Sequence, residues 1–317
     1  MNNKNLKIAI IGTYYGEFPK WIQYWLKSCK DNNTIDFYIV TDLKINVPSN
    51  VHIINLSLEE FKELAENKLD IKISLKKPYK LCDYKPVYGK ILEDYIKDYD
   101  YWGHCDFDLI FGDIRFFVEK YNIEKYDKFL PLGHLALYRN TEKCNNYYKM
   151  EGSKCGDYIS VFQSDGNHAF DETGGIYSIY KKNKLPMFTK RIFAEIKTFH
   201  KRLRLKFRDK NYRHQVFYYE NGKVFRAYYK KGKVETQEFI YIHFRRNIPV
   251  DDDYDFNQIK NFYITDSGFY EKENGNPTLD EIEKYNKNPG WIIEGLETIK
   301  FCLKKIINIF LALKNRK

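Results

Sequence analysis

The sequence is organised around residues 100–113, which read DYWGHCDFDLIFGD. This stretch predicts a short aromatic strand that runs into two carboxylates one residue apart, Asp106 and Asp108, before a turn and a helix. In an extended backbone, residues i and i+2 point to the same side, so the two carboxylates converge and Phe107 faces the core. Carboxylates held a few ångströms apart repel each other by roughly 4 kcal/mol at an effective dielectric of about 20. The pair therefore predicts a divalent cation between them, and oxygen ligands suit Mg²⁺ or Mn²⁺.

An Asp-X-Asp triplet is also common on solvated turns, so the choice between a metal site and a solvated turn depends on the rest of the sequence. The length of 317 residues allows one large α/β domain or two small ones. A hydrophobic fraction of 43% with 17% aromatic residues is sufficient for a core and argues against general disorder. The net charge of +10 and the isoelectric point of about 9.0 favour an anionic partner. Nucleotide diphosphates, acidic lipid headgroups and nucleic acid all meet that description.

Six cysteines are scattered along the chain, with no Cys-X-X-Cys pair and no Cys/His grouping of zinc spacing. Met1–Lys7 passes directly into a strand-like run, which predicts that a signal peptide is absent. Scattered cysteines without a secretion signal fit a reducing cytoplasm. There is no run of about 18 apolar residues, so we expect no membrane-spanning segment. The prediction is a cytoplasmic protein.

The first strand is predicted at Leu6–Ile11, and it ends at a turn of small residues. An apolar strand followed by a turn and a helix is typical of the start of a doubly wound α/β sheet. Ligands of such sheets bind beyond the carboxyl ends of the strands. Thr13 and Tyr14 could therefore contact a nucleotide base or ribose, and a plain strand–helix loop is the alternative. Asp42, which follows the second predicted strand Ile35–Val40, could meet a uridine or ribose hydroxyl.

The next elements extend this α/β pattern. A helix is predicted at Pro19–Cys29 and a third strand at Val51–Leu56. Ser57 followed by Glu60 is a capping-box signal for a helix. The alternation over about seventy residues supports a mostly parallel sheet. No Gly-X-Gly-X-X-Gly and no phosphate-binding P-loop occur, which argues against dehydrogenases and P-loop kinases.

Residues 77–89, KPYKLCDYKPVYG, form a polar stretch just before the carboxylate strand. We interpret Lys80, Asp83 and Lys85 as residues close to a diphosphate or a sugar, and an exposed Lys-Asp-Lys loop is the alternative. A helix is predicted behind them at Val87–Tyr95. Two short strands around a glycine turn are then predicted within residues 129–139, and a helix within residues 140–149.

Residues 168–175, HAFDETGG, place a histidine and two acids ahead of a glycine pair. Such a loop could position an acceptor hydroxyl beside His168. Either Asp171 or Glu172 could take up its proton as a general base. A helix N-cap with solvated acids is the alternative.

The second half of the chain begins with a basic stretch, in which residues 181–213 carry thirteen Lys or Arg. Ile192, Ile196, Phe199 and Leu203 follow helical spacing and predict a basic amphipathic helix. A solvated face is favoured there, and contact with anionic lipid or a phosphorylated acceptor is the alternative.

A three-stranded meander is predicted within residues 216–246. Its hairpin signals are Asn221-Gly222 and Lys231-Gly232, which stand between stretches of period-two alternation. The last predicted strand, Phe239–Phe244, places His243 at its end. A histidine in such a position is usually only a polar strand terminus.

Residues 288–317 are predicted to form a basic amphipathic helix, separate from a main domain of residues 1–287. We expect an interfacial helix on an anionic membrane surface, through residues 291–317, where each nearby cation adds about 1 kcal/mol. Packing on its own domain or a coiled-coil homodimer are the alternatives. Its apolar seam comprises Ile292, Leu296, Ile299, Leu303, Ile306, Phe310 and Leu313.

In this order, these elements resemble a bacterial GT-A glycosyltransferase with an Asp-X-Asp motif. More narrowly, the chain is similar to uncharacterised enzymes of surface-polysaccharide (capsule or lipopolysaccharide) biosynthesis, in which runs like KPYKLCDYKP and HCDFD occur. The similarity covers roughly residues 6–247. It implies a GT-A-like, Rossmann-like α/β fold with a mostly parallel central sheet, a C-terminal β-meander and a final amphipathic helix.

The resemblance also implies an activity. It is that of a hexosyltransferase-type enzyme that uses a nucleotide-sugar donor, Mn²⁺ or Mg²⁺ on the diphosphate, and a glycan or lipid-linked acceptor. Asp106 and Asp108 would hold the metal. In glycosyltransferases of the glycogenin and bacterial galactosyltransferase type, a late-chain histidine joins that pair, and His243 takes this place here. The protein would work in the cytoplasm or on the inner face of the cytoplasmic membrane.

Two other classes of protein remain as alternatives. A metal-dependent phosphotransferase or nuclease could use the same carboxylates, but it usually needs more acids nearby, and Asp113 is the one close candidate. A non-enzymatic RNA-binding protein would fit the positive charge and the many aromatic residues. However, the basic residues are spread widely and no RNA-recognition motif occurs, so nucleic acid is not the expected partner.

Overall fold

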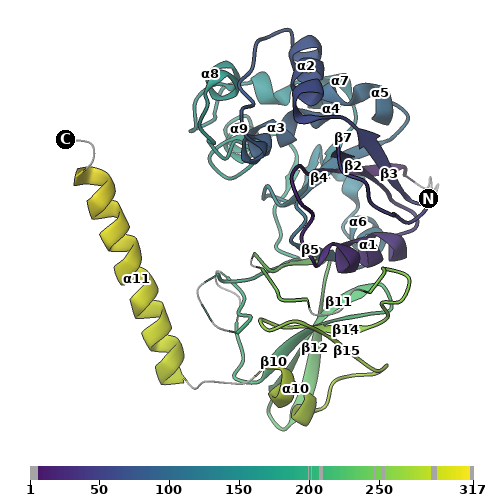
Figure 1. The fold of residues 1–317 in the computed structure, drawn as a ribbon, viewed down its shortest axis with the longest axis vertical. Coiled ribbons are helices and arrows are strands. Elements are labelled where there is room, and N and C mark those ends of the chain that lie inside the picture. The colour runs from purple at the N-terminus through teal and green to yellow at the C-terminus, as the bar shows by residue number, and fades with distance from the viewer. Residues whose placement is uncertain are drawn as a thin grey trace. The chain divides into compact units, whose positions relative to one another are not determined.

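A computed structural model describes residues 6–198, 200, 202–206, 210–245, 247–250, 254–286 and 291–314 (Figure 1). The chain forms two compact units. Unit 1 comprises Met1–Leu109 and Asp113–Ile192, and unit 2 comprises Ile110–Gly112 and Phe193–Lys317. The division of the sequence into residues 1–287 and 288–317 stays a prediction.

Unit 1 is built on a seven-stranded sheet in the order β3-β2-β1-β4-β7-β6-β8. The first four strands in this order are parallel, β7 is antiparallel to β4 and β6, and β8 is parallel to β6. This arrangement confirms the predicted α/β fold with a mostly parallel, Rossmann-like central sheet. The strands are β1 (Ile8–Thr13), β2 (Asp36–Thr41), β3 (Val51–Asn55), β4 (Tyr101–Cys105), β6 (Lys128–Phe129), β7 (Leu135–Arg139) and β8 (Met187–Phe188).

Helices cover both faces of this sheet. In Figure 1, α1 and α6 lie on one face, and α2 and α4 lie on the other. Alternate residues of β1 face opposite layers, so Ala9 and Ile11 join a buried cluster with Phe61 of α2 and Tyr88 of α4. The helices are α1 (Ile22–Asp31), α2 (Leu58–Leu69), α3 (Leu81–Tyr84), α4 (Tyr88–Ile91), α5 (Glu93–Ile96), α6 (Ile114–Lys120), α7 (Glu142–Asn145), α8 (Tyr158–Gln163) and α9 (Ile176–Lys182).

The capping box predicted before α2 is confirmed. The Ser57 hydroxyl accepts a hydrogen bond from Glu60 N at 3.2 Å, and the Glu60 carboxylate accepts one from Ser57 N at 2.7 Å. These two bonds satisfy backbone donors that the first turn of a helix leaves without a partner.

Two predicted helices are shorter in the structure. The one expected at 87–95 is divided into α4 and α5, because Leu92 has φ −106° and ψ 23°. The one expected within 140–149 consists of α7 alone, followed by a 3₁₀ turn at Tyr147–Lys149. Asn146 donates its side-chain amide to the Glu142 carbonyl, and such local bonds compete with helix propagation.

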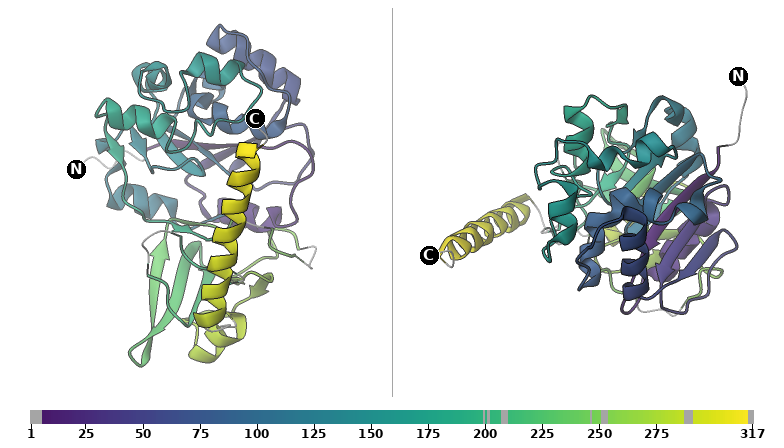
Figure 2. Two further views of the ribbon diagram at one scale, coloured as in Figure 1. Left: turned by 90° about the vertical axis from the view of Figure 1, so that its left-hand side faces the viewer. Right: turned by 90° about the horizontal axis from the view of Figure 1, so that it is seen from above.

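Unit 2 contains a five-stranded antiparallel sheet in the order β12-β11-β10-β14-β15. Its strands β10, β11 and β12 are the predicted meander, and β11 and β12 appear in green in the left view of Figure 2. A second sheet has the order β5-β13-β9. The bounds are β5 (Leu109–Phe111), β9 (Ala194–Glu195), β10 (Gln215–Glu220), β11 (Lys223–Lys230), β12 (Lys233–Phe239), β13 (Tyr241–His243), β14 (Phe262–Ile264) and β15 (Phe269–Glu271).

The prediction of a basic amphipathic helix around 192–203 is wrong. The chain there forms β9 and an isolated bridge between Ile196 and Leu205. Two arginines of the basic stretch, Arg202 and Arg204, are buried and donate to backbone carbonyls, whereas Arg191 and Arg213 are exposed. Phe199, the remaining member of the predicted seam, lies outside the described residues.

Two helices complete unit 2, namely α10 (Leu279–Tyr285) and α11 (Trp291–Lys314). The helix α11, drawn in yellow in Figure 1, is the predicted C-terminal amphipathic helix. Within the part of the chain that the structure describes, no helix is long and apolar enough to span a bilayer.

Candidate functional site

The Asp-X-Asp element follows β4 at the carboxyl edge of the parallel strands in unit 1. Its backbone is fixed by three hydrogen bonds. Asp106 N donates to the His134 carbonyl at 3.0 Å. The indole N–H groups of Trp21 and Trp25 donate to the carbonyls of Phe107 at 3.0 Å and of Asp106 at 3.3 Å. The hydrogen bonds of these two tryptophans were not predicted from the sequence, because their helical spacing indicated only that they face the core.

Phe107 lies in the core, as predicted. Its ring packs 4.8 Å from the Trp25 ring and 5.1 Å from the Tyr14 ring, measured between centroids. Gly12 of β1 allows this packing, because a Cβ atom there would lie 2.7 Å from the Phe107 ring. The aromatic packing holds the backbone between the two carboxylates in place.

Lys85 joins Asp106 to Asp171. Its ammonium group donates to Asp106 Oδ1 at 2.5 Å, to Asp171 Oδ2 at 3.0 Å and to the Gly133 carbonyl at 3.2 Å. The side chains of Lys85 and Asp171 are 7% and 5% exposed, whereas that of Asp106 is 31% exposed. Burial by itself would lower the pKa of Lys85, but the two carboxylates raise that pKa well above its usual range.

The sequence did not indicate a role for Gly133, although the Asp171 carboxylate can lie against the backbone there only because residue 133 has no side chain. A Cβ atom at this position would lie 2.5 Å from Asp171 Oδ2, which is closer than real Cβ contacts. A glycine between two short strands was the one available signal, and it indicated only a turn.

Lys80 and Asp83 form a second buried pair, 2.8 Å apart and 3% and 0% exposed. Lys80 also donates to the carbonyls of Val161 and Gly166 at 2.7 and 2.6 Å. The Asp83 carboxylate accepts from the backbone N–H groups of residues 168 and 170 at 3.0 and 2.9 Å. This pair therefore fixes the loop that carries His168, Asp171 and Glu172.

The two acids of that loop do not cap a helix, so the N-cap alternative is wrong. The helix α9 begins after Gly175 without a side-chain cap, and Asp171 is buried. Burial and the neighbouring Asp171 raise the pKa of the Glu172 carboxyl. His168 Nε2 lies 2.9 Å from the Ser164 hydroxyl.

The predicted nucleotide contacts lie at the ends of β1 and β2. The Thr13 hydroxyl is 2.9 Å from the Tyr88 hydroxyl, and Tyr14 stacks on Phe18 at 5.0 Å between ring centroids. Asp42 is exposed directly after β2. These residues share the edge of the sheet at which Asp106 follows β4, and their roles stay predictions.

His243 belongs to unit 2, whereas Asp106 and Asp108 belong to unit 1. It ends β13, pairs in register with Glu195 of β9 and is 8% exposed. Its backbone carbonyl accepts a hydrogen bond from Ile196 N at 3.0 Å. Its role as a third metal ligand stays a prediction.

A further buried lysine, Lys128, was also not predicted from the sequence. Its side chain is fully buried in β6 and donates to the Leu130 carbonyl at 2.6 Å. Burial lowers the pKa of Lys128 to about 7. The Leu130 that it contacts has φ +74°, so the lysine supports the start of the loop that leads to Gly133.

Comparison with solved structures finds similarities at low identity. The galactosyltransferase LgtC in complex with donor and acceptor sugar analogs is 12% identical, with a TM-score of 0.33, over 59% of this chain and 75% of that chain. The glycosyltransferase GlyE of Streptococcus pneumoniae TIGR4 is 15% identical, with a TM-score of 0.31, over 58% and 45%. Mouse xyloside xylosyltransferase 1 is 7% identical, with a TM-score of 0.32, over 61% and 88%.

A search of curated proteins finds no match to this sequence. A family model, by contrast, matches residues 10–273, which is most of the chain. The protein belongs to this family, which is described as a family of unknown function (DUF6625).

Proposed function

We propose that this protein is a glycosyltransferase that moves a sugar from a nucleotide-sugar donor to a glycan or lipid-linked acceptor in bacterial surface-polysaccharide biosynthesis. The observation that carries the proposal is the position of Asp106-Phe107-Asp108 directly after β4 of a mostly parallel sheet. The carboxyl edge of such a sheet is where α/β proteins bind nucleotides. Thr13, Tyr14 and Asp42 are the proposed nucleotide contacts at this edge.

We further propose that Asp106 and Asp108 hold Mn²⁺ or Mg²⁺, with His243 as the third ligand. Two carboxylates on a fixed backbone fit such a cation, which prefers oxygen donors, and Asp106 is partly open to solvent. A bound cation would act as a Lewis acid on the departing diphosphate. Lys85 keeps Asp106 in one orientation, which is a preorganised electrostatic contribution.

The proposed acid–base chemistry belongs to the 168–172 loop. Glu172 is the better general base of the two acids, because its raised pKa favours proton uptake while Asp171 is paired with Lys85. Asp171 then acts as a positioning residue, and His168 contacts the acceptor hydroxyl. Lys80 and Asp83 support this loop from beneath, in addition to their predicted contact with the donor.

The test is a thermal-shift screen of UDP, GDP, CDP and CMP sugars with and without Mn²⁺. We expect stabilisation that requires both sugar nucleotide and metal, by about 2.7 kcal/mol when the ligand is at one hundred times its Kd. Asp108→Ala should abolish the shift and metal-dependent donor hydrolysis while circular dichroism stays unchanged. The exposed Asp98, substituted by alanine, is the matched control and should keep both.

Other outcomes of this screen favour the alternatives. A shift with metal and nucleotide but independent of the sugar would favour a phosphotransferase or nuclease. Binding of RNA without metal would favour an RNA-binding protein. An Asp108→Ala variant that keeps its metal-dependent activity would refute the metal-site proposal.

The helix α11 supports a second part of the proposal, peripheral attachment to an anionic membrane surface. The apolar side chains Ile292, Leu296, Ile299, Leu303 and Ile306 are all between 52% and 60% exposed. Lys300, Lys304 and Lys305 are exposed on the same helix. A helix with exposed apolar side chains and lysines fits the interface of a bilayer with acidic headgroups. A homodimer through α11 is the alternative.

A further inference from the structure

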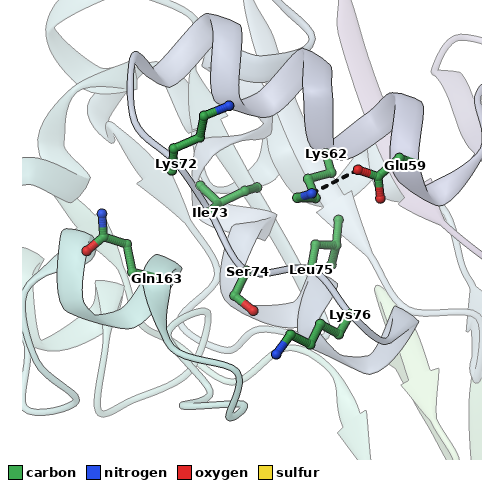
Figure 3. Close-up of a pocket in the computed structure, with 8 residues that line it drawn as sticks. All are labelled: Glu59, Lys62, Lys72, Ile73, Ser74, Leu75, Lys76 and Gln163. Atoms are coloured by element: carbon green, nitrogen blue, oxygen red, sulfur yellow. Dashed lines mark hydrogen bonds and ion pairs between the residues drawn. The ribbon is translucent and has the colours of Figure 1, made fainter.

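A pocket in unit 1 lies apart from the predicted site residues, none of which lines it (Figure 3). It encloses about 410 Å³, within the range of about 300–1,000 Å³ that is usual for small-molecule sites. Its walls come from α2, from the segment Lys72–Lys76 and from Gln163 at the end of α8. We call it the lysine pocket, because Lys62, Lys72 and Lys76 line it together with one acid, Glu59.

The segment Lys72–Lys76 has the alternation of an extended chain. Ile73 and Leu75 are 7% and 4% exposed, so their side chains are largely buried in the core of unit 1. The side chains of Lys72 and Lys76 are 88% and 73% exposed. Ser74, between them, is on the same side by the period of two. The pocket therefore combines two ammonium groups, at opposite ends of the segment and pointing apart, with the Ser74 hydroxyl and the apolar side chains of Ile73 and Leu75 (Figure 3).

This segment is held in place by its backbone. Ile73 N donates to the Glu66 carboxylate at 3.0 Å, and Ser74 N donates to the Phe162 carbonyl at 2.8 Å. The Tyr84 hydroxyl donates to the Ser74 carbonyl at 2.7 Å. A ligand would consequently meet a wall whose backbone is already ordered.

Each of the three lysines is in an ion pair, and both partners are exposed only in the pair of Lys76 with Asp165, at 73% and 63%. Lys62 lies 2.8 Å from Glu59, Lys72 lies 2.7 Å from Glu66, and Lys76 lies 2.6 Å from Asp165. Glu66 and Asp165 are not among the lining residues. Water and salt screen the exposed pair of Lys76 and Asp165, so it contributes little to stability and an incoming anion can compete for this ammonium group. Lys72, whose partner Glu66 is 13% exposed, is itself 88% exposed and is open to a ligand on its solvent side.

The neutral groups of the pocket suit a sugar. The Ser74 hydroxyl donates to Asp165 Oδ1 and can accept a hydrogen bond from a sugar hydroxyl, and the Gln163 amide can both donate and accept. Three residues after Gln163, the Gly166 carbonyl accepts a hydrogen bond from Lys80, and Lys80 pairs with Asp83, which accepts from the His168 backbone N–H. The wall of the pocket thus continues into the loop proposed to position the acceptor.

We propose that the lysine pocket binds an anionic saccharide, in which a carboxylate or phosphate meets the exposed ammonium group of Lys72 or of Lys76. Its role as a site for the acceptor rests on the proposed glycosyltransferase function. Binding of the anionic saccharide does not depend on that function, because none of the predicted donor or metal residues lines the pocket.

The test is calorimetric titration of the full chain with glucuronate, glucose 6-phosphate, glucose and inorganic phosphate. At least one of the two anionic sugars should bind ten times more tightly than glucose, and raising the salt from 50 to 500 mM should weaken it. The better of the two identifies carboxylate or phosphate as the recognised group. Equal binding of glucose would overturn the proposal, and so would inorganic phosphate that binds as tightly as the better anionic sugar.

Substitutions locate the site. The double variant Lys72→Gln/Lys76→Gln should lower the affinity for the anionic sugar at least tenfold. Lys182→Gln is the matched control, since Lys182 is also an exposed lysine in an ion pair, with Glu151 at 3.1 Å, and lies outside the pocket. An unchanged affinity in the double variant would overturn the assignment to this pocket.

The two proposals fail separately. The double variant should keep the thermal shift with sugar nucleotide and Mn²⁺, because it leaves the Asp-X-Asp element intact. Asp108→Ala should keep the affinity for the anionic sugar. A wild-type protein that binds no sugar nucleotide would refute the proposed glycosyltransferase function. A wild-type protein that binds sugar nucleotides but does not prefer anionic sugars to glucose would refute only the proposal for the lysine pocket.

Discussion

Lys85 links two carboxylates that are far apart in sequence, at positions 106 and 171. A buried cation between two acids is costly to desolvate, and it persists only when its partners are well placed. Here three acceptors surround the three N–H donors of the ammonium group. The stability of unit 1 and the orientation of Asp106 are therefore expected to depend on the same side chain.

We expect Lys85→Met to lower the free energy of unfolding by about 3–5 kcal/mol, because Asp171 would be left as a buried charge that has lost its cation. Urea denaturation followed by circular dichroism measures this loss. The double variant Lys85→Met/Asp171→Asn should recover part of it, since it removes the buried charge as well. Lys182→Met, which removes an exposed pair with Glu151, should cost less than about 1 kcal/mol. A loss below about 1 kcal/mol for Lys85→Met would refute the buried pair.

At the scale of elements, the two hairpins of the meander use the same turn with different residues. Asn221 and Gly222 have φ values of +50° and +77°, and Lys231 and Gly232 have +49° and +85°. Positive φ at both central residues is the signature of a type I′ turn, which suits the twist of paired strands. Asn tolerates this left-handed region, whereas it costs most L-residues roughly 1–2 kcal/mol.

The pair of turns gives a reciprocal prediction. Lys231→Asn should raise the free energy of unfolding by up to about 1 kcal/mol, and Asn221→Lys should lower it by a similar amount. Urea midpoints of the two variants measure the change, with an unchanged m-value showing that the unfolding transition is the same. Shifts of the same sign in both variants would contradict the turn assignment.

Elements with local signals were predictable from the sequence. The strand β1, the capping box of α2 and both hairpins depend on residues within a few positions of each other. The prediction of a helix around 192–203 failed, because the apolar spacing of these residues is also compatible with buried strands and irregular segments. The carboxylate of Glu195 in β9 accepts from Lys206 and Arg245, which lie 11 and 50 residues later. A single sequence does not show which residues far apart along the chain pair with each other.

The candidate site divides in the same way. The Asp-X-Asp element could be located because a strand pattern leads directly into it. Its environment could not, because Lys85 precedes Asp171 by 86 residues and Gly133 by 48. The lysine pocket was not predicted either, since its walls come from α2, an irregular segment and α8.

At the scale of the molecule, the net charge of +10 fits three anionic partners at once. The proposed donor carries a diphosphate, the lysine pocket suits an acidic sugar, and α11 suits acidic lipid. Each partner would be sensitive to salt, because charges separated by more than about 8–10 Å are screened at physiological ionic strength. Salt dependence alone therefore cannot distinguish them, and the variants must.

The helix α11 can be tested with vesicles. The full chain should sediment with phosphatidylserine-containing vesicles and not with pure phosphatidylcholine, and cutting before Asn288 should abolish sedimentation. Lys300→Gln/Lys304→Gln/Lys305→Gln keeps the apolar side chains and should weaken binding by about 3 kcal/mol, at about 1 kcal/mol for each cation, which is over a hundredfold. Lys97→Gln/Lys120→Gln/Lys154→Gln, in unit 1, is the matched control and should bind like wild type. Unchanged binding after the cut would refute the membrane role, and a dimer that dissociates on the cut, measured by light scattering, would favour the homodimer.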